Sequence, residues 1–281
     1  MTKLTDFKQN KYIKVKGKLI DLSRAKIMGI INVTPDSFYY KSKFQIMDEL
    51  LNQAHEMIDQ GAEILDIGGV STRPGALEIT SDEELKRVLN PLRLIRKEFP
   101  NSLISLDTYR SKIAQIGLNE GVDIINDISG GIIDEHFFSI ISKNKCPYVL
   151  THGNGMAHKM FSTNNNESFI QNLIRYFSQK INELRQMGVN DIIIDPGFGF
   201  GKTIEQNYEV IQNFELLKIL QKPILVGLSR KSMIFNKLKI TTEDSLNGTS
   251  ALNSILFEKG ATIFRVHDVK EMSQIRTLLA F

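Results

Sequence analysis

The chain has 281 residues, a mass of 31.9 kDa and a formal net charge of +3. Hydrophobic residues make up 42% of it and charged residues 24%, which is ordinary for a globular protein and excludes a disordered, collagenous or coiled-coil chain. The net charge is too small to indicate nucleic-acid binding, and the sequence has no basic block interleaved with aromatic residues.

Targeting signals are missing from the sequence as given. No stretch approaches the ~18 consecutive apolar residues of a membrane span, and residues 1–18 lack the apolar core of a signal peptide. We therefore expect a cytoplasmic protein with no membrane partner. The single cysteine, Cys146, cannot form an internal disulfide, and its place before Pro147 and an apolar run predicts a buried, unreactive thiol.

Eight short apolar runs recur along the chain. Each is too short for a typical helix, and their Ile, Val and Leu content is typical of buried parallel strands. The runs are Lys26–Ile31, Glu63–Ile67, Leu103–Leu106, Asp123–Ile125, Tyr148–Leu150, Asp191–Ile194, Pro223–Leu228 and Thr262–Val266.

Longer segments between these runs have apolar residues three and four positions apart, the spacing of amphipathic helices. Ser81, with Glu84 three residues later, predicts a capping box at one helix start. Glycines stand where helix C-terminal caps are expected. The helical segments are Ile46–Gln60, Ser168–Met187, Ile204–Leu220, Thr249–Lys259 and Val269–Leu279, and the glycines are Gly61, Gly121, Gly188 and Gly260.

Eight strand–helix units in roughly 250 residues predict a (β/α)8 TIM barrel, a single domain over residues 1–281. An open doubly wound sheet is the alternative. Before the first unit, Lys11–Leu22 alternates apolar and polar residues around Gly17. This pattern predicts an N-terminal β-hairpin extension that closes the bottom of the barrel.

Polar residues follow every predicted strand, at the end of a barrel where active sites lie. Any one of them is equally well explained as a loop or cap residue, but their convergence favours a site. Cations there suit a phosphate or carboxylate, and carboxylate or amide oxygens suit the N–H groups of a heterocycle. The cationic candidates are Arg73, Arg230, Lys231, Arg265 and His267, and the acceptors are Asp107, Asn126 and Asp195.

A glycine-rich turn, Asp195–Thr203, resembles a phosphate loop but fails both common spacings. A Walker A loop needs glycine where Pro196 stands, and a dinucleotide fingerprint needs it where Lys202 stands. Gly227–Lys231 likewise fails the nucleophile-elbow pattern. ATPase, dinucleotide-enzyme and serine-hydrolase functions therefore have no motif support.

The same turn places Phe198 or Phe200 near the barrel mouth, where an aromatic ring stacks on a flat ligand unless both rings belong to the core. Zinc is not indicated, because His152 and His158 lack ligand spacing and no H-E-x-x-H or C-x-x-C motif occurs. Asn32 together with a diphosphate would suit Mg²⁺, which keeps most of its own waters.

At these residues the sequence resembles the dihydropteroate synthases. The match runs from about Ile27 to Glu271, and its motifs occur in order at the predicted strand ends. The matching segments are Met28–Phe38, Asp66–Ala76, Leu106–Tyr109, Ile125–Gly131, Asp195–Lys202, Gly227–Met233 and Arg265–Asp268.

The resemblance implies a transferase of folate biosynthesis. It condenses dihydropterin diphosphate with p-aminobenzoate to give 7,8-dihydropteroate and pyrophosphate, with Mg²⁺ as cofactor. The implied catalytic residues are Asp107, Arg73 and Lys231. The implied binding residues are Asp107, Asn126, Asp195, Phe200 and Lys231 for the pterin, Asn32 (through Mg²⁺), Arg73, Arg265 and His267 for the diphosphate, and Thr72 and Ser232 for p-aminobenzoate.

The chain departs from the family pattern in two loops. Asp36-Ser-Phe38 is followed by Tyr39-Tyr-Lys-Ser42 where the family usually has Asp-Gly-Gly after one residue, so a loop expected to close over substrate loses two glycines. After the fifth strand His152-Gly-Asn-Gly155 replaces the frequent His-Met-x-Gly. These departures bear on rate, p-aminobenzoate binding and sulfonamide sensitivity more than on fold or pterin binding.

Two other functions are compatible with the sequence. A non-catalytic pterin-binding paralogue would explain the altered first loop. A pterin-dependent methyltransferase uses a similar barrel but binds no diphosphate, so Arg73, Arg265 and His267 argue against it. The resemblance further implies a homodimer and a target of sulfonamides, neither of which a sequence pattern tests.

Overall fold

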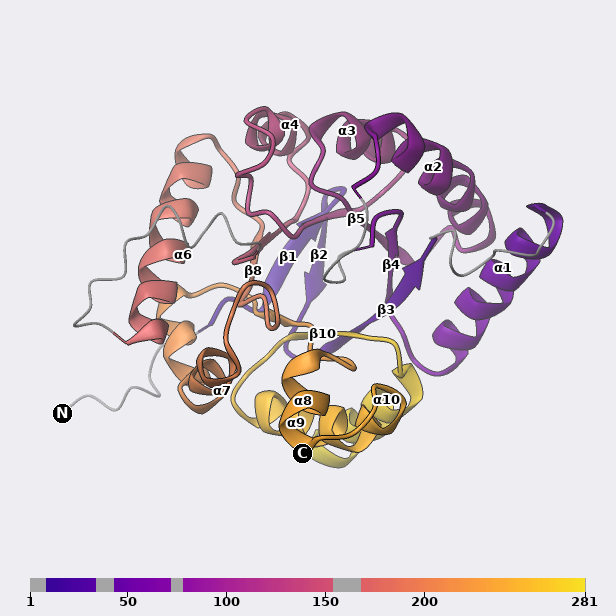
Figure 1. Cartoon of the computed structure of the whole chain (residues 1–281). Coiled ribbons are helices and arrows are strands. Elements are labelled where there is room, and N and C mark those ends of the chain that lie inside the picture. Colours follow the sequence, from indigo (N-terminus) through magenta and orange to yellow (C-terminus); the bar gives the residue numbers. More distant parts are fainter. Residues whose placement is uncertain (1–8, 34–42, 72–77, 154–167, 281) are drawn as a thin grey trace.

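The computed structural model describes residues 9–33, 43–71, 78–153 and 168–280, in which helices form a ring around a parallel sheet (Figure 1). The sheet has eight strands in the order β8-β7-β6-β5-β4-β3-β10-β9, and a parallel bridge between Ile194 and Ile224 joins its two edges. The (β/α)8 barrel is therefore confirmed. Its strands are β3 (Lys26–Asn32), β4 (Ile64–Gly68), β5 (Leu103–Asp107), β6 (Ile124–Asp127), β7 (Tyr148–Thr151), β8 (Ile192–Asp195), β9 (Leu225–Val226) and β10 (Ile263–Val266).

The expected helices are present within the described residues, together with shorter ones that the periodicity did not single out. In that part of the chain, none is both long and apolar enough to cross a bilayer. The helices are α1 (Lys43–Asp59), α2 (Ser81–Glu98), α3 (Ser111–Asn119), α4 (Phe137–Asn144), α6 (Phe169–Gln186), α7 (Ile204–Gln212), η3 (Phe214–Leu220), α8 (Ser232–Leu238), η4 (Glu243–Ser245), α9 (Leu246–Glu258) and α10 (Val269–Leu279).

Strand β9 is shorter than the apolar run Pro223–Leu228 predicted. Pro223 lacks an N–H for a ladder, and the N–H of Ile224 donates instead to the Thr262 hydroxyl at 2.9 Å. A hydrogen bond to a side chain therefore replaces part of the backbone ladder between β9 and β10.

Two helix boundaries correct the sequence analysis. The capping box predicted from Ser81 and Glu84 is wrong, because Thr80 is the N-cap and its hydroxyl accepts from the Glu83 N–H at 3.2 Å. Glu84 is thereby placed on the buried side of α2. The expected helix Ile204–Leu220 breaks at Asn213, whose side-chain amide donates to the Glu209 carbonyl at 2.9 Å.

The glycines predicted to end helices do so in the left-handed region, with φ of 106° at Gly61, 95° at Gly121, 83° at Gly188 and 97° at Gly260. Glycine adopts these angles without the penalty that a Cβ imposes. Each such turn returns the chain to the start of the next strand.

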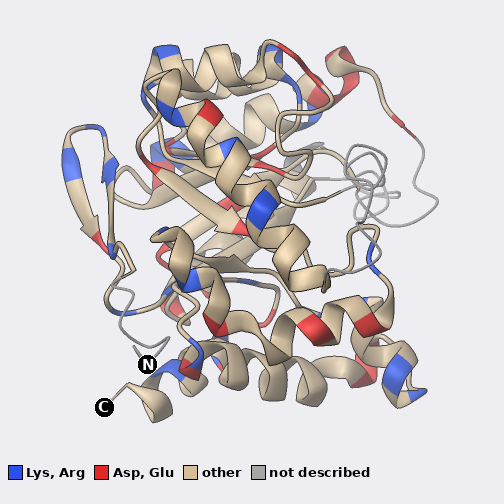
Figure 2. Cartoon of the chain, turned by 90° about the vertical axis from the view of Figure 1, so that its left-hand side faces the viewer, with Lys and Arg blue, Asp and Glu red and all other residues tan. Residues whose placement is uncertain are grey.

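The N-terminal hairpin of β1 (Tyr12–Val15) and β2 (Lys18–Asp21) is confirmed. Figure 2 shows it at one end of the barrel, and Ile13, Val15 and Leu22 pack among the inward residues at the start of the strands. The Lys16 ammonium pairs with Asp123 at 2.6 Å and anchors the hairpin tip. The hairpin therefore closes the bottom of the barrel, as predicted, and leaves the carboxyl ends of the strands for a ligand.

A second apolar core fills the layer between the sheet and the helices. Cys146 belongs to it, and burial raises the pKa of its thiol to about 12. The expected burial of this thiol is confirmed, and a thiol that is protonated at neutral pH is a poor nucleophile.

Candidate functional site

Buried polar side chains gather at the carboxyl ends of the strands, above the closed bottom. Asp107 ends β5, Asp195 ends β8, Asn126 lies on β6 and Arg265 on β10. Asp107 pairs in register with Asn126, so the two lie side by side on neighbouring strands. The structure thus brings together four of the residues that the sequence analysis selected.

Arg265 joins Asp107 to Asp66 in one hydrogen-bonded network. Its Nε donates to Asp66 Oδ2 and its terminal nitrogen to Asp107 Oδ2, both at 2.7 Å. Burial disfavours the guanidinium charge, but Asp66 and Asp107 outweigh it and raise the pKa of Arg265. Arg265 therefore stays charged and holds Asp107 in a fixed orientation.

Asp66 has a larger part in the site than the sequence analysis gave it. Its side chain is completely buried, and its Oδ2 also accepts from Asn126 Nδ2 at 3.1 Å. This bond fixes the Asn126 amide so that the carbonyl oxygen is left as an acceptor for a ligand. A carboxylate in the middle of the apolar strand Ile64–Gly68 was the signal that could have identified it.

Asp107 has a carboxyl group that titrates near neutrality. Burial raises its pKa to about 7; Arg265 works against this shift, whereas the negative charge of Asp66 adds to it. A buried carboxylate of raised pKa at a strand end is a common property of functional sites.

The opposite side of the barrel mouth is formed by Asp195 and Lys231. The N–H of Gly197 donates to Asp195 Oδ1 at 2.8 Å, which leaves Oδ2 as an acceptor. Burial raises the pKa of Asp195 and lowers that of Lys231 to about 8, and in each case the charge of the other opposes the shift. The Lys231 ammonium lies 4.1 Å from the centre of the Phe200 ring and donates to the Phe198 carbonyl at 2.5 Å.

The structure separates the two phenylalanines of the glycine-rich turn. Phe198 is completely buried in the outer core. Phe200 is partly exposed beside Lys231. The turn therefore offers one aromatic ring, Phe200, to a flat ligand at the mouth.

Lys202 holds that turn in shape, a function the sequence analysis did not identify. Its ammonium donates to the carbonyls of His152 at 2.7 Å, Gly197 at 2.8 Å and Phe200 at 3.3 Å. Burial lowers the pKa of Lys202 to about 7, and the negative charge of Asp195 opposes this shift. The three carbonyls engage all of its ammonium protons. Because this lysine is engaged by backbone, it does not serve as the phosphate ligand of a phosphate loop.

Gly197 shows how tightly the turn is packed. Its φ is 67°, and a Cβ built on it would lie 2.1 Å from the His152 carbonyl oxygen. Only glycine fits there.

The rim carries the remaining candidates. His267 is exposed, and its Nδ1 lies 3.0 Å from the Ser229 hydroxyl. Asn32 and Ser232 are exposed at the end of β3 and the start of α8. Arg230, one of the cationic candidates, instead forms a two-bond ion pair with Asp268 at 3.0 and 2.6 Å, so its guanidinium is engaged within the protein.

Other strand-end residues support the backbone. Asp127 accepts at 2.7 Å from the Tyr148 hydroxyl and from the N–H groups of Ser129 and Gly131. Thr72, Arg73 and the loop residues 39–42 lie outside the described residues.

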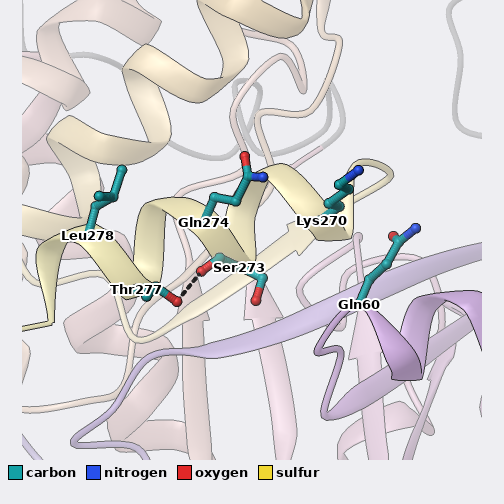
Figure 3. Close-up of a pocket in the computed structure, with 6 residues that line it drawn as sticks. All are labelled: Gln60, Lys270, Ser273, Gln274, Thr277 and Leu278. Atoms are coloured by element: carbon teal, nitrogen blue, oxygen red, sulfur yellow. Dashed lines mark hydrogen bonds between the residues drawn. The ribbon is translucent and has the colours of Figure 1, made fainter.

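A surface cavity of the structure lies apart from this site. Among the described residues, no group of three or more His, Cys, Asp or Glu side chains is placed to hold a metal. A cavity of about 480 Å³ lies on the helical layer, between the end of α1 and α10 (Figure 3). None of the strand-end residues lines it; its lining is Gln60, Lys270, Ser273, Gln274, Thr277 and Leu278.

Comparison with known proteins identifies the family. A family model described as pterin binding enzyme matches residues 28–267. A dihydropteroate synthase from Clostridium beijerinckii is 40% identical over 254 residues, which cover 89% of this chain and 91% of that protein. The chain belongs to the dihydropteroate synthase family of pterin-binding enzymes.

Solved structures of this family agree with the barrel. The dihydropteroate synthase from Clostridium difficile, crystallised in the presence of pteroic acid, superimposes with a TM-score of 0.85 at 38% identity, covering 91% of this chain and 95% of that one. The enzyme from Xanthomonas albilineans with 4-aminobenzoic acid gives a TM-score of 0.86 at 28% identity, covering 96% and 97%. The resemblance seen in the sequence motifs is confirmed.

Proposed function

We propose that the chain condenses 6-hydroxymethyl-7,8-dihydropterin diphosphate with p-aminobenzoate, giving 7,8-dihydropteroate and pyrophosphate in folate biosynthesis. Like the synthases it is related to, it is a transferase. The observation that carries the proposal is the buried set of acceptors, Asp107, Asn126 and Asp195, beside the cations Lys231 and Arg265. A pterin presents ring and amino N–H donors together with acceptor atoms, so both kinds of group find partners.

The pterin half of the site positions the heterocycle. The free oxygens of Asn126 and Asp195 accept from pterin N–H groups, and Lys231 donates to its acceptor atoms. Phe200 packs against the ring beside Lys231. Because these groups are buried, a ligand that lacks the matching donors leaves them unpaired, which makes recognition selective.

The chemical step breaks the bond between the pterin methylene carbon and the diphosphate oxygen, and the electron pair leaves with pyrophosphate. Positive charge then develops on the pterin methylene, where ionised Asp107 stabilises it. Arg265, Arg73 and His267 stabilise the departing diphosphate. The amine of p-aminobenzoate attacks the carbon and loses a proton, which completes the new C–N bond.

p-Aminobenzoate is proposed to bind at the rim beside the pterin, with Thr72 and Ser232 as its binding residues. Ser232 is the first residue of α8 and is exposed to such a ligand. Backbone N–H groups at a helix start favour a carboxylate.

Mg²⁺ is proposed as the cofactor. Asn32 is exposed at the end of β3, and it pairs in register with Gly68, the neighbour of Asp107 across the sheet. One oxygen donor at the rim fits an ion that takes its other ligands from water and diphosphate. When bound, Mg²⁺ neutralises charge on the leaving pyrophosphate.

The proposal extends to three properties of the whole protein. Sulfonamides, which resemble p-aminobenzoate, are proposed to compete at its subsite. The protein is proposed to be a cytoplasmic homodimer.

The pH dependence of the rate tests the role of Asp107. Since burial raises its pKa to about 7, kcat/KM for the pterin diphosphate should rise tenfold per pH unit below that value and level off above it. Deprotonation of Lys231, with its pKa near 8, should then lower the rate at higher pH. In Asp107→Asn the decrease in rate at low pH that is due to Asp107 should be lost. A smaller decrease that remains reports titration of the substrate. A pH profile identical to that of wild type would refute the assignment.

Pyrophosphate release is the experiment that tests the function. Purified protein with Mg²⁺ and dihydropterin diphosphate is assayed with and without p-aminobenzoate, and dihydropteroate is followed by chromatography. Release coupled to dihydropteroate formation is the expected result. Pterin binding without product would instead support the non-catalytic paralogue and point to Tyr39–Ser42 as the cause.

A further inference from the structure

Ser229 carries a nearly buried hydroxyl beside His267 at the rim of the barrel. It lies in the turn between β9 and α8, and only 6% of its surface is exposed. Its Oγ accepts from the backbone N–H of His267 at 3.3 Å and lies 3.0 Å from Nδ1 of the same residue. One side chain therefore contacts both the backbone and the ring of His267.

The hydrogen-bonding capacity of this hydroxyl decides which ring nitrogen carries the proton. A serine hydroxyl has one proton to donate and two lone pairs that accept, and one lone pair takes the His267 N–H. Across the described part of the chain, the hydroxyl has no contact with an acceptor other than Nδ1. A proton on Nδ1 would leave the hydroxyl proton unpaired in a nearly buried side chain, which is unfavourable. The hydroxyl therefore donates to Nδ1, and the neutral ring carries its own proton on Nε2.

The residues that follow Ser229 and His267 in the chain hold this contact in place. Arg230 and Asp268 form the two-bond ion pair already described, and it joins the same two turns. The N–H of Arg230 also donates to the Thr249 hydroxyl at 3.2 Å. These bonds keep Arg230 at a φ of 55°, in the left-handed region that few residues with a Cβ adopt. The backbone beside Ser229 is thus cross-linked to the backbone beside His267.

The position of the ring proton matters for an anionic ligand. An ionised diphosphate offers only acceptor oxygens, so it bonds a ring nitrogen that carries a proton and is repelled by one that presents a lone pair. Nδ1 and Nε2 point in different directions from the ring, and Nδ1 is turned toward Ser229. The tautomer therefore decides whether neutral His267, exposed at the rim, favours or opposes a diphosphate.

We propose that Ser229 is a positioning residue that keeps neutral His267 in the tautomer with its proton on Nε2, from which the ring donates to the substrate diphosphate. The inference rests on the proposed function, because that function assigns His267 to the diphosphate. Ser229 itself does not touch the substrate in this arrangement. Its effect is thus confined to the diphosphate and passes through the His267 ring.

Long-range ¹⁵N spectra of the imidazole side chains test the tautomer directly. The chain has five histidines, and the signals that disappear in His267→Ala identify those of His267. At about pH 8.5, where an ordinary histidine is neutral, the wild-type ring should carry its proton on Nε2. Ser229→Ala should give a mixture of the two tautomers. A wild-type ring protonated on Nδ1 would overturn the proposal, and so would an unchanged tautomer in Ser229→Ala.

Calorimetry tests the consequence for the ligand, through the ratio of affinities for the pterin diphosphate and its alcohol. Ser229→Ala should lower this ratio about 3- to 10-fold, because only the molecules with the proton on Nε2 bind the diphosphate fully. Affinity for the alcohol should stay within about twofold of wild type. Ser254→Ala, which removes a hydroxyl bonded within α9, is the matched control and should match wild type. An equal loss of affinity for both ligands in Ser229→Ala would indicate general damage to the site and refute the proposal.

A double-mutant cycle shows whether the effect passes through the ring. His267→Ala alone should lower the ratio at least as much as Ser229→Ala does. In the His267→Ala background, Ser229→Ala should change the ratio less than about twofold, since no ring remains to orient. A full effect of Ser229→Ala without the ring would overturn the proposal. If Ser229→Ala does not fold, Ser229→Cys takes its place, because a thiol is only a weak donor.

Failure of this inference can be distinguished from failure of the proposed function. Protein that binds the pterin diphosphate but forms no dihydropteroate contradicts the proposed function, and the affinity ratio of Ser229→Ala then still decides the inference. Product formation together with a wild-type ratio in Ser229→Ala contradicts the inference alone. If wild type binds the diphosphate no more tightly than the alcohol, His267 does not hold the diphosphate, and the inference is refuted.

Discussion

Asp195→Ala is expected to abolish measurable pterin binding. Its carboxylate accepts the Gly197 N–H through Oδ1 and leaves Oδ2 for the ligand. Each hydrogen bond to a charged acceptor is worth roughly 1.5–3 kcal/mol, and an unpaired buried donor adds a further penalty. Loss of the ligand bond together with this penalty therefore corresponds to about 100- to 10,000-fold weaker binding, measured by isothermal calorimetry with the pterin diphosphate.

Asp195→Asn distinguishes recognition from loop geometry. The amide oxygen can still accept from Gly197, so the turn keeps its shape, while the NH₂ group opposes the pterin donors. Asp195→Asn should unfold at a temperature close to wild type, because the Gly197 bond is kept and burial already raises the pKa of the Asp195 carboxyl, so that loss of its charge costs little. Unchanged pterin affinity in a folded Asp195→Asn variant would remove Asp195 from the site.

The barrel could be predicted because its signals are local. Strand composition, helical spacing and the glycines at helix ends are read within a few residues, and each has a direct physical cause. The predicted N-cap of α2 was wrong because two neighbouring residues could each cap the helix. Thr80 and Ser81 are both good caps, and the structure uses Thr80, which places Glu84 on the buried side of α2 instead of at the helix start.

The residues of the site could be predicted from the sequence, but the hydrogen bonds among them could not. Asp107, Asn126, Asp195 and Arg265 follow or end strands, and barrel geometry alone brings them together. The bonds among them join residues far apart in sequence, such as Arg265 and Asp66, and no spacing rule reports such pairs.

The supporting residues were missed for the same reason. Asp66 orients Asn126, and Lys202 holds the glycine-rich turn through backbone carbonyls. A lysine after glycines suggests phosphate binding, whereas the ammonium group of Lys202 donates to carbonyls of the protein's own backbone. Sequence motifs therefore locate groups that meet ligands more readily than groups that position them.

Arg265→Ala is expected to have the largest combined effect on stability and turnover. Removal of the guanidinium leaves Asp66 and Asp107 buried without a counter-charge, which costs about 3–5 kcal/mol when one partner of a buried pair is lost. The pKa of Asp107, already raised to about 7, rises further because the arginine lowers it. At neutral pH the carboxyl is then protonated, and kcat should fall by about a thousandfold or more.

The stability of Arg265→Ala should depend on pH in a defined direction. A carboxyl whose pKa is raised on folding binds its proton more tightly in the folded state, so the free energy of unfolding falls as pH rises from about 4 through the raised value. The variant should therefore approach wild-type stability near pH 5 and lose it by pH 8, as followed by thermal unfolding. An equal deficit at both pH values would mean that lost packing, not unpaired charge, is responsible.

Arg265→Lys separates the charge from the fork geometry. The ammonium still neutralises a carboxylate, so the stability deficit at pH 8 should shrink, but it cannot bond Asp66, Asp107 and a diphosphate together. The ratio of affinities for the pterin diphosphate and its alcohol, measured by calorimetry, should therefore fall about tenfold or more in both variants. If wild type prefers the diphosphate and both variants keep that preference, Arg265 acts only on Asp66 and Asp107, and the diphosphate must be held by other residues of the rim.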